Sequence, residues 1–346
     1  TNDSFAESTL LILEIPKTND KSELAAEQLF ASLHGILRDA SLIETGLPQE
    51  HLSFEIATVN GQITFYLCLP KTLRNFVEGQ IYAQYPSVQI KTADYDYALN
   101  THKPVIHTAE VNLKESEFLP IRTFNGFEVD PLAGITGTLA KLEDADEELW
   151  IQILIRPIAD SWHKDSEKWV KDNIKDKKTK FTPDIKWFLT ALGALAKPPE
   201  AGDASDKPEL SEREKLQIAE AEKKAAKLGF KVKIRIVYTG SNEDHARLRM
   251  QSIIGTFKQF NSTNLNGFEM SQSSFDPEKV TAYQARSFND EGFILNIEEL
   301  ASVYHLPHTN VETPNIVWAS SKTAELPSNY QPKFRPKSRH FSFWHD

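Results

Sequence analysis

The sequence predicts an α+β fold built from two consecutive βαββαβ units. Three features lead to this prediction. In the first hundred residues, two amphipathic helical stretches alternate with short apolar or alternating segments that are typical of strands. The same order of patterns returns in residues 108–271. A charged, helix-forming stretch at residues 160–229 interrupts this second unit between its second and third strands.

In the first unit, Pro16 ends an apolar strand predicted at residues 10–15, and Ser22 is a candidate cap for a helix that continues to Leu37. The next two strands flank Asn60-Gly61, the dipeptide favoured in two-residue type I′ hairpins. The predicted hairpin strands, second helix and final strand lie at residues 52–59, 62–69, 73–81 and 87–93.

The second unit follows the same order. Asp130-Pro131 is a typical helix start, with an acid at the cap and proline at the first helical position. Val232, Ile234 and Ile236 alternate with basic residues, which predicts a strand with one apolar face. The predicted strands lie within residues 111–122, 149–155, 230–238 and 267–271, and the helices at 132–142 and 242–257.

These patterns predict a ferredoxin-like domain at residues 1–100 and a second one at residues 101–285, with helices on one face of each antiparallel sheet. The insertion at residues 160–229 is expected to form an antiparallel helical hairpin, and Ser211 with Glu214 offers a capping box for its second helix. Residues 286–346 are predicted to contain a helix at 296–304, followed by a proline-rich tail that wraps a surface.

Composition narrows the class of protein. The chain has 346 residues and a formal net charge of −10, which opposes non-specific binding to nucleic acid. Cys68 is the only cysteine, so no internal disulfide can form, and its apolar strand predicts a buried, unreactive thiol. The longest uncharged, largely apolar run, residues 187–196, is about half of the roughly 20 residues that cross a bilayer, so no membrane span is predicted.

The sequence contains no motif of a known type of enzyme site. The phosphate-binding pattern G-x-x-x-x-G-K-[ST], the G-x-S-x-G elbow, H-E-x-x-H and paired Cys-x-x-Cys are absent. Gly134 and Gly137 fall inside a helical stripe and are interpreted as helix-packing glycines. His305 and His308 are three residues apart, but Pro307 breaks any helix that would place both rings on one face. The sequence therefore predicts no enzymatic activity, no cofactor and no metal.

The alternative function is a module that binds single-stranded nucleic acid, because ferredoxin-like sheets include RNA-binding modules. Lys231, Lys233 and Arg235 form a basic stripe on one strand, which is either a solvent face or a strip that contacts phosphates. The C-terminal tail combines basic and aromatic residues, and its candidate nucleic-acid contacts are Lys333, Arg335, Lys337 and Arg339.

Several stretches resemble one family. They are residues 26–37, 127–142, 151–162, 229–237 and, most specifically, 293–318, where a predicted helix is followed by His-Leu-Pro and then Thr-Pro-Asn. These stretches are similar to the region that precedes the motor domain in conjugation-type coupling ATPases of candidate-phyla (Patescibacteria) bacteria. Those ATPases are type IV secretion proteins with a HerA/TraG-like nucleotide-binding domain downstream.

The resemblance implies an assembly or substrate-docking module without the motor itself, because residues 1–346 contain no phosphate loop. It implies a downstream or separately encoded motor ATPase as partner, secreted DNA or protein as substrate, and a homo-oligomer formed through the motor. It also implies a cytoplasmic location at the inner face of the membrane, held by an anchor upstream of Thr1.

Overall fold

The computed structural model of the chain describes residues 7–44, 46–143, 146–175, 210–288 and 292–320. Within these residues, nine strands form one antiparallel sheet. The strands are β1 (Ser8–Glu14), β2 (Leu52–Val59), β3 (Gln62–Pro70), β4 (Gln89–Thr92), β5 (Val105–Leu113), β6 (Glu148–Pro157), β7 (Gly229–Gly240), β8 (Phe268–Met270) and β9 (Phe293–Asn296). Helices packed on an antiparallel sheet confirm the predicted α+β class.

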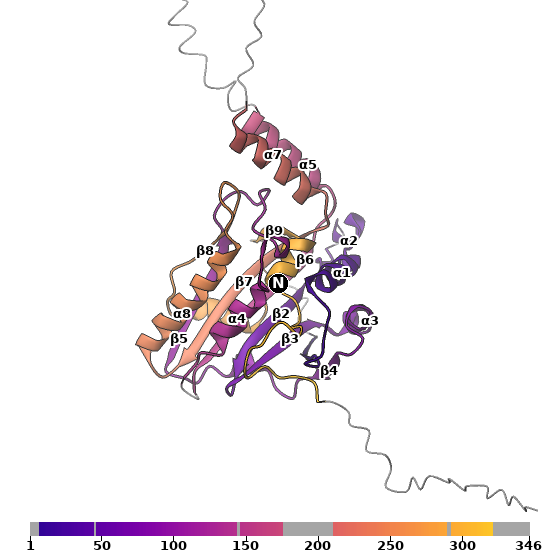
Figure 1. Ribbon diagram of the computed structural model, residues 1–346. Coiled ribbons are helices and arrows are strands. Elements are labelled where there is room, and N and C mark those ends of the chain that lie inside the picture. The colour runs from indigo at the N-terminus through magenta and orange to yellow at the C-terminus, as the bar shows by residue number, and fades with distance from the viewer. Residues whose placement is uncertain (1–6, 45, 144–145, 176–209, 289–291, 321–346) are drawn as a thin grey trace, which may run out of the picture.

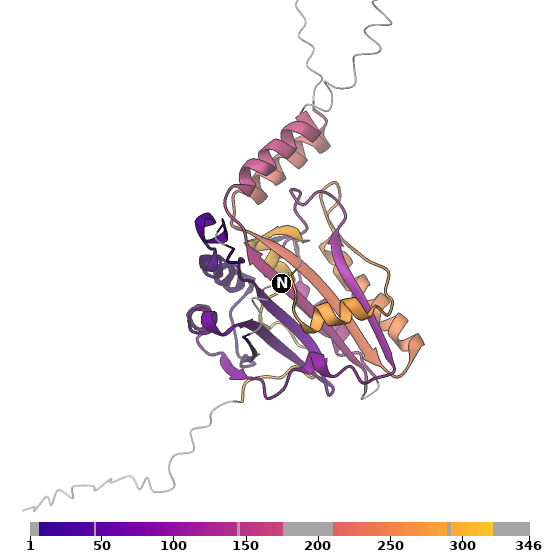
Figure 2. The ribbon, with the colours of Figure 1, turned by 180° about the vertical axis from the view of Figure 1, so that it is seen from behind.

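Helices lie on both faces of this sheet, and two of them form the insertion described below. They are α1 (Glu23–Leu33), α2 (Ala40–Glu44), α3 (Arg74–Gln84), α4 (Pro131–Leu139), α5 (Trp162–Val170), α7 (Glu212–Ala225), α8 (Glu243–Phe257), α9 (Pro277–Gln284) and α10 (Ile297–Val303). Figure 1 shows α1, α3, α4 and α8 in front of the sheet, and Figure 2 shows α9 across the opposite face. On that opposite face, Tyr283 of α9 packs against Trp150 and Val237. The prediction that helices cover only one face is therefore wrong.

The strand order repeats in the two halves of the sheet. β1 to β4 lie in the order β4-β1-β3-β2, and β5 to β8 lie in the corresponding order β8-β5-β7-β6. The halves meet where β2 pairs with β6, with Phe54 opposite Ile153 and Ile56 opposite Ile151. They share one sheet and one continuous hydrophobic core. The division into domains at residues 1–100 and 101–285 stays a prediction.

Local signals in the sequence set several turns and helix starts. Asn60 and Gly61 have φ values of 50° and 74°, as a type I′ turn between β2 and β3 requires. Asp130 caps α4 by accepting a hydrogen bond from a backbone N–H of the first turn. Ser211 and Glu214 form the predicted capping box of α7. These three predictions are confirmed.

The insertion forms the predicted helical hairpin. α5 and α7 pack against each other and stand away from the sheet, and this pair is called the arm below (Figure 1). Residues 176–209, between these two helices in the sequence, lie outside the described residues. No helix in the described part of the chain combines the length and apolar character that crossing a membrane requires.

The C-terminal segment differs most from its prediction. α10 confirms the expected helix, but Leu300, Tyr304 and Leu306 are buried in the main core. The segment then runs beside β3, where Ile63 donates its backbone N–H to the carbonyl of Asn315. Residues 293–316 therefore help to build the core, and the expectation that the chain only wraps a surface after residue 304 is wrong for residues 305–316. The tail at residues 321–346 lies outside the described residues.

Candidate functional site

Two carboxylates and two imidazoles converge where α1, α4 and the segment after α10 meet. Glu23 is the first residue of α1, Asp130 caps α4, and His305 and His308 follow α10. One potential ligand atom of each side chain lies within 4.8 Å of the other three. This group, called the acid–histidine cluster below, joins three segments that are far apart in the sequence.

Asp130 is the centre of the cluster. His305 donates its Nδ1–H to the carbonyl oxygen of Ala301 at 2.8 Å, and its Nε2 lies 2.9 Å from Asp130 Oδ1. His308 Nε2 lies 2.8 Å from Asp130 Oδ2 and 3.9 Å from Glu23 Oε1. The side chains of His305 and Asp130 are 0% and 2% exposed, so little water screens these charges.

The two acids stabilise a proton on His308. The adjacent carboxylate of Asp130, followed by that of Glu23, raises the pKa of His308 to about 9. Burial raises the pKa of Asp130, but the interactions with His305 and His308 outweigh it and hold this pKa below its usual range. With no other cation bound, the cluster at neutral pH is thus an ion-pair network around a protonated His308.

This geometry corrects the sequence argument about the two histidines. Pro307 prevents a shared helix, but His305 and His308 still meet, because the chain turns after α10 and stacks their rings with centroids 6.1 Å apart. Asn19 holds this turn by donating from Nδ2 to the carbonyl of Pro307. Spacing along the chain could not reveal the two acids, which come from other helices; the Asp130-Pro131 helix start was the one local signal.

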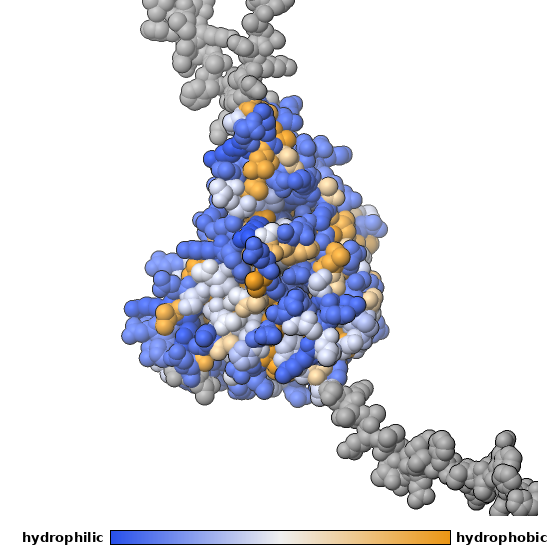
Figure 3. Space-filling model, in the orientation of Figure 1, coloured by the Kyte–Doolittle hydropathy of each residue, from blue (hydrophilic) through white to orange (hydrophobic). Residues whose placement is uncertain are grey.

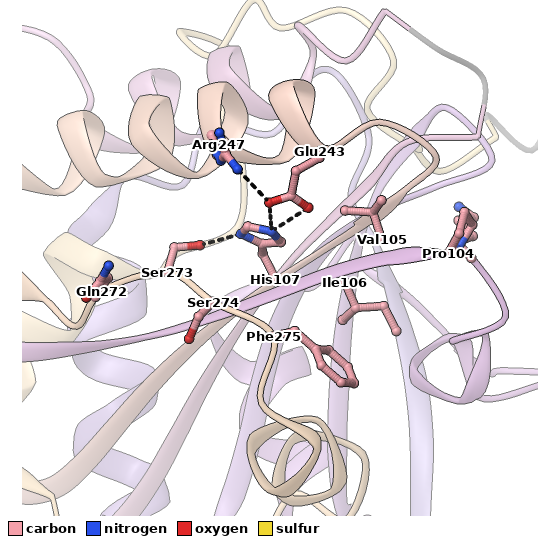
Figure 4. Close-up of a pocket in the computed structure, with 11 residues that line it drawn as sticks. Pro104, Val105, Ile106, His107, Glu243, Arg247, Gln272, Ser273, Ser274 and Phe275 are labelled. Atoms are coloured by element: carbon pink, nitrogen blue, oxygen red, sulfur yellow. Dashed lines mark hydrogen bonds and ion pairs between the residues drawn. The ribbon is translucent and has the colours of Figure 1, made fainter.

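A second polar group lines an open cavity of about 760 Å³ beside β5 and α8 (Figure 4). His107 of β5 lies between Glu243, the first residue of α8, and Ser273. Its Nε2 lies 2.9 Å from Glu243 Oε1, and its Nδ1 lies 3.1 Å from Ser273 Oγ. A neutral imidazole satisfies both contacts when Nε2–H donates to the carboxylate and Nδ1 accepts from the hydroxyl.

A serine, a histidine and a carboxylate in line can activate a hydroxyl group by general-base catalysis. Here the side chain of Glu243 is 49% exposed, and Arg247 lies 3.4 Å from the same carboxylate. Water and the Arg247 guanidinium therefore weaken the electrostatic effect of the Glu243 carboxylate on His107, which a catalytic triad would need. We interpret the group as a structural hydrogen-bond network that connects β5 to α8 and to residues 271–275. The sequence did not indicate it, because its three members form no local motif.

Comparison of the sequence with models of known protein families gives a match, which spans almost all of the described residues. A family model matches residues 6–319. The chain belongs to the family described as a domain of unknown function, DUF8128. No curated protein matches the chain. The DUF8128 match spans both halves of the sheet, the arm and the C-terminal segment, so the family corresponds to the joined sheet and not to one half of it.

The predicted basic stripe lies on β7 of the DUF8128 fold, beside acidic side chains. Lys231 Nζ is 2.8 Å from Glu117 Oε2, whereas Lys233 and Arg235 lie 3.8 Å and 3.7 Å from Glu110 Oε1. The side chain of Arg235 is also 3% exposed. These acids neutralise the charges that would contact phosphates, so the geometry does not favour a nucleic-acid strip here. The other candidate contacts lie outside the described residues: Lys333, Arg335, Lys337 and Arg339.

The sequence assigned structural roles to Cys68, Gly134 and Gly137, and their positions in the DUF8128 fold test these roles. Cys68 is buried, as predicted, and burial raises the pKa of its thiol to about 12. A Cβ on Gly134 would lie 3.4 Å from Thr256 of α8, so this glycine lets α4 and α8 pack closely. A Cβ on Gly137 would contact nothing within 4 Å, so the packing interpretation is wrong for Gly137.

Proposed function

We propose that this chain is a non-catalytic assembly or substrate-docking module that acts beside the motor ATPase of a type IV secretion or conjugation system. The proposal begins from the five stretches that resemble the pre-motor region of such ATPases. It treats the halves of the sheet as two ferredoxin-like units, since each combines βαββαβ order with the strand order 4-1-3-2. A position at the inner face of the membrane, near the transferred DNA or protein, belongs to the same proposal.

The arm is the observation that carries this proposal. It stands away from the sheet, and its apolar side chains form small clusters apart from the main core (Figure 1). Figure 3 shows apolar atoms exposed along the arm among charged ones. Leu216 of α7 is 40% exposed. A protruding helix pair with an exposed apolar stripe suits docking into a groove of a partner protein.

Buried polar contacts connect the base of the arm to the sheet, so the orientation of the arm is coupled to that of the sheet. Lys224 of α7 is fully buried, with Nζ 3.1 Å from Glu299 Oε2 and 2.9 Å from the carbonyl oxygen of Ile294. Asn296 donates from Nδ2 to the backbone carbonyl of the same lysine. Breaking such a buried pair is costly, which supports a rigid connection between the arm and the C-terminal segment.

The test is binding of the full chain to the motor ATPase domain encoded downstream or adjacent in the same genome, measured by analytical ultracentrifugation. We expect a stable complex, and we expect Leu216→Glu to weaken it about tenfold or more, because a charge replaces an apolar contact of the arm. The chain alone is expected to release no phosphate from ATP.

The matched control is Leu248→Glu on α8, a leucine that is 53% exposed but lies on the body of the protein. This variant should bind the motor domain as the wild type does. A correctly folded wild-type chain that forms no complex would refute the proposed function. Equal weakening by both variants would refute the role of the arm.

A further inference from the structure

We propose that Glu23, Asp130, His305 and His308 bind a divalent transition-metal ion of the zinc type. Imidazole nitrogens and carboxylate oxygens are common zinc ligands, and four of them suit a closed, structural site. The inference is separate from the docking function, because it concerns an ion that fastens α1, α4 and the C-terminal segment to one another.

The spacing of the donor atoms suits one ion. Around a tetrahedral ion with bonds of about 2.0–2.1 Å, neighbouring donor atoms lie about 3.3 Å apart. In the cluster, Asp130 Oδ1 lies 2.9 Å from His305 Nε2, Asp130 Oδ2 lies 2.8 Å from His308 Nε2, and His308 Nε2 lies 3.9 Å from Glu23 Oε1. One potential ligand atom of each side chain lies within 4.8 Å of the other three, so side-chain shifts that bring these atoms about 3.3 Å apart would place them around one centre.

His305 is oriented as a metal ligand. Its Nδ1–H donates to the carbonyl of Ala301, so Nε2, which lies 2.9 Å from Asp130 Oδ1, is the ring nitrogen left to bind a metal ion. Metal-binding histidines commonly donate their other N–H in this way, which fixes the tautomer and the ring orientation. Without a metal, a proton on Nε2 makes this 2.9 Å contact a hydrogen bond to the carboxylate, and a metal ion would take the place of that proton.

His308 and Asp130 each have a buried polar atom without a well-aligned hydrogen bond. Asp130 Oδ2 and His308 Nε2 are buried and lie 2.8 Å apart, but they are not aligned as a hydrogen bond. An ion bound by both atoms satisfies them together. Two ionised carboxylates and two neutral imidazoles carry a charge of −2, which a divalent ion balances, whereas one proton leaves a negative charge in a mostly buried group.

One side of the cluster lies close to solvent. A cavity of about 450 Å³ extends to His308 and is lined by Lys17, Thr309 and Trp318 among others. The side chains of His308 and Glu23 are 8% and 16% exposed, so they form the outer side of the cluster. The buried side is formed by His305 and Asp130. An ion would therefore enter on the side of His308 and Glu23, past the edge of the His308 ring.

The test measures the metal content of the full chain, purified without a polyhistidine tag, by inductively coupled plasma mass spectrometry. We expect about one zinc per chain, and we expect cobalt(II) in its place to give the visible absorption of a four-coordinate site. Removal of zinc by EDTA should lower Tm by about 5 °C, and added zinc chloride should restore it, because an ion that binds only the folded state stabilises that state.

Two variants separate metal binding from the structural role of the same residues. Asp130→Asn keeps a good helix cap but loses the carboxylate, and His308→Gln removes one imidazole. Each should weaken zinc binding on the order of 100-fold. The exposed His102 gives the control His102→Gln, which should bind zinc as the wild type does.

Folded wild-type chain without stoichiometric zinc or cobalt, and with a Tm unchanged by EDTA, would overturn the proposal. Undiminished zinc binding by both cluster variants would also overturn it. The zinc and cobalt measurements on the wild-type chain decide the question even if a variant fails to fold.

Discussion

Replacing Arg286 with methionine is expected to lower the free energy of unfolding by about 3–5 kcal/mol, because it leaves a buried carboxylate without its cation. The side chains of Arg286 and Glu55 are 4% and 0% exposed. Arg286 donates to Glu55 Oε1 at 3.0 Å and to Asp96 Oδ1 at 2.9 Å. Urea denaturation followed by tryptophan fluorescence at pH 7 measures this change.

The choice of methionine and two further variants make this prediction specific. Arg286 has a φ of 48°, and methionine keeps the same backbone cost, since it is neither glycine nor β-branched. Adding Glu55→Gln should recover part of the loss, because it removes the unpaired charge. Arg247→Met, at an exposed ion pair on α8, should cost less than about 1 kcal/mol. Similar losses from Arg286→Met and Arg247→Met would mean that the buried network contributes little.

Leu300→Ala is expected to cost about 2–5 kcal/mol of unfolding free energy, because it removes a fully buried leucine from the main core. Leu300 belongs to α10, which packs against α1. The same denaturation experiment measures the loss, and Leu248→Ala, at a leucine that is 53% exposed, should cost about 0.5 kcal/mol or less. Equal small effects would mean that α10 contributes little to the stability of the core.

Much of the fold was predictable where strong local signals agree with the final packing. The Asn60-Gly61 turn fixes the hairpin of β2 and β3, and Asp130-Pro131 starts α4. β5 was expected within residues 111–122, but it spans Val105–Leu113. Its first half carries His107 and Thr108, whose polar partners come from elsewhere in the chain, so the apolar alternation is weak there.

Short elements were missed because their signals are weak. α9 begins with Asp276-Pro277, the same start as α4, but it has eight residues, of which Val280 and Tyr283 are buried. β9 has four residues, and it became a strand because β7 extends beyond β5 and offers an open edge. In both cases tertiary contacts decide the structure, and such contacts are not visible in local periodicity.

The acid–histidine cluster was not predictable from spacing, because its members come from three segments. Only the packing of α10 against α1 and α4 brings His305 and His308 to Glu23 and Asp130. The basic stripe shows the opposite case: Lys231 and its neighbours were visible in the sequence, but their acidic partners on other segments were not. For both groups, charge and function depend on residues that are distant in the sequence.

Hydrogen exchange at the junction of β2 and β6 tests most directly the claim that the two halves form one cooperative scaffold. Mass spectrometry of the intact chain would compare backbone amides of β2 and β6 with those of β3 and β7, inside each half. We predict that the junction amides exchange as slowly as the others, only through global unfolding. Clearly faster exchange at β2 and β6 would show that the halves separate locally and would contradict a single scaffold.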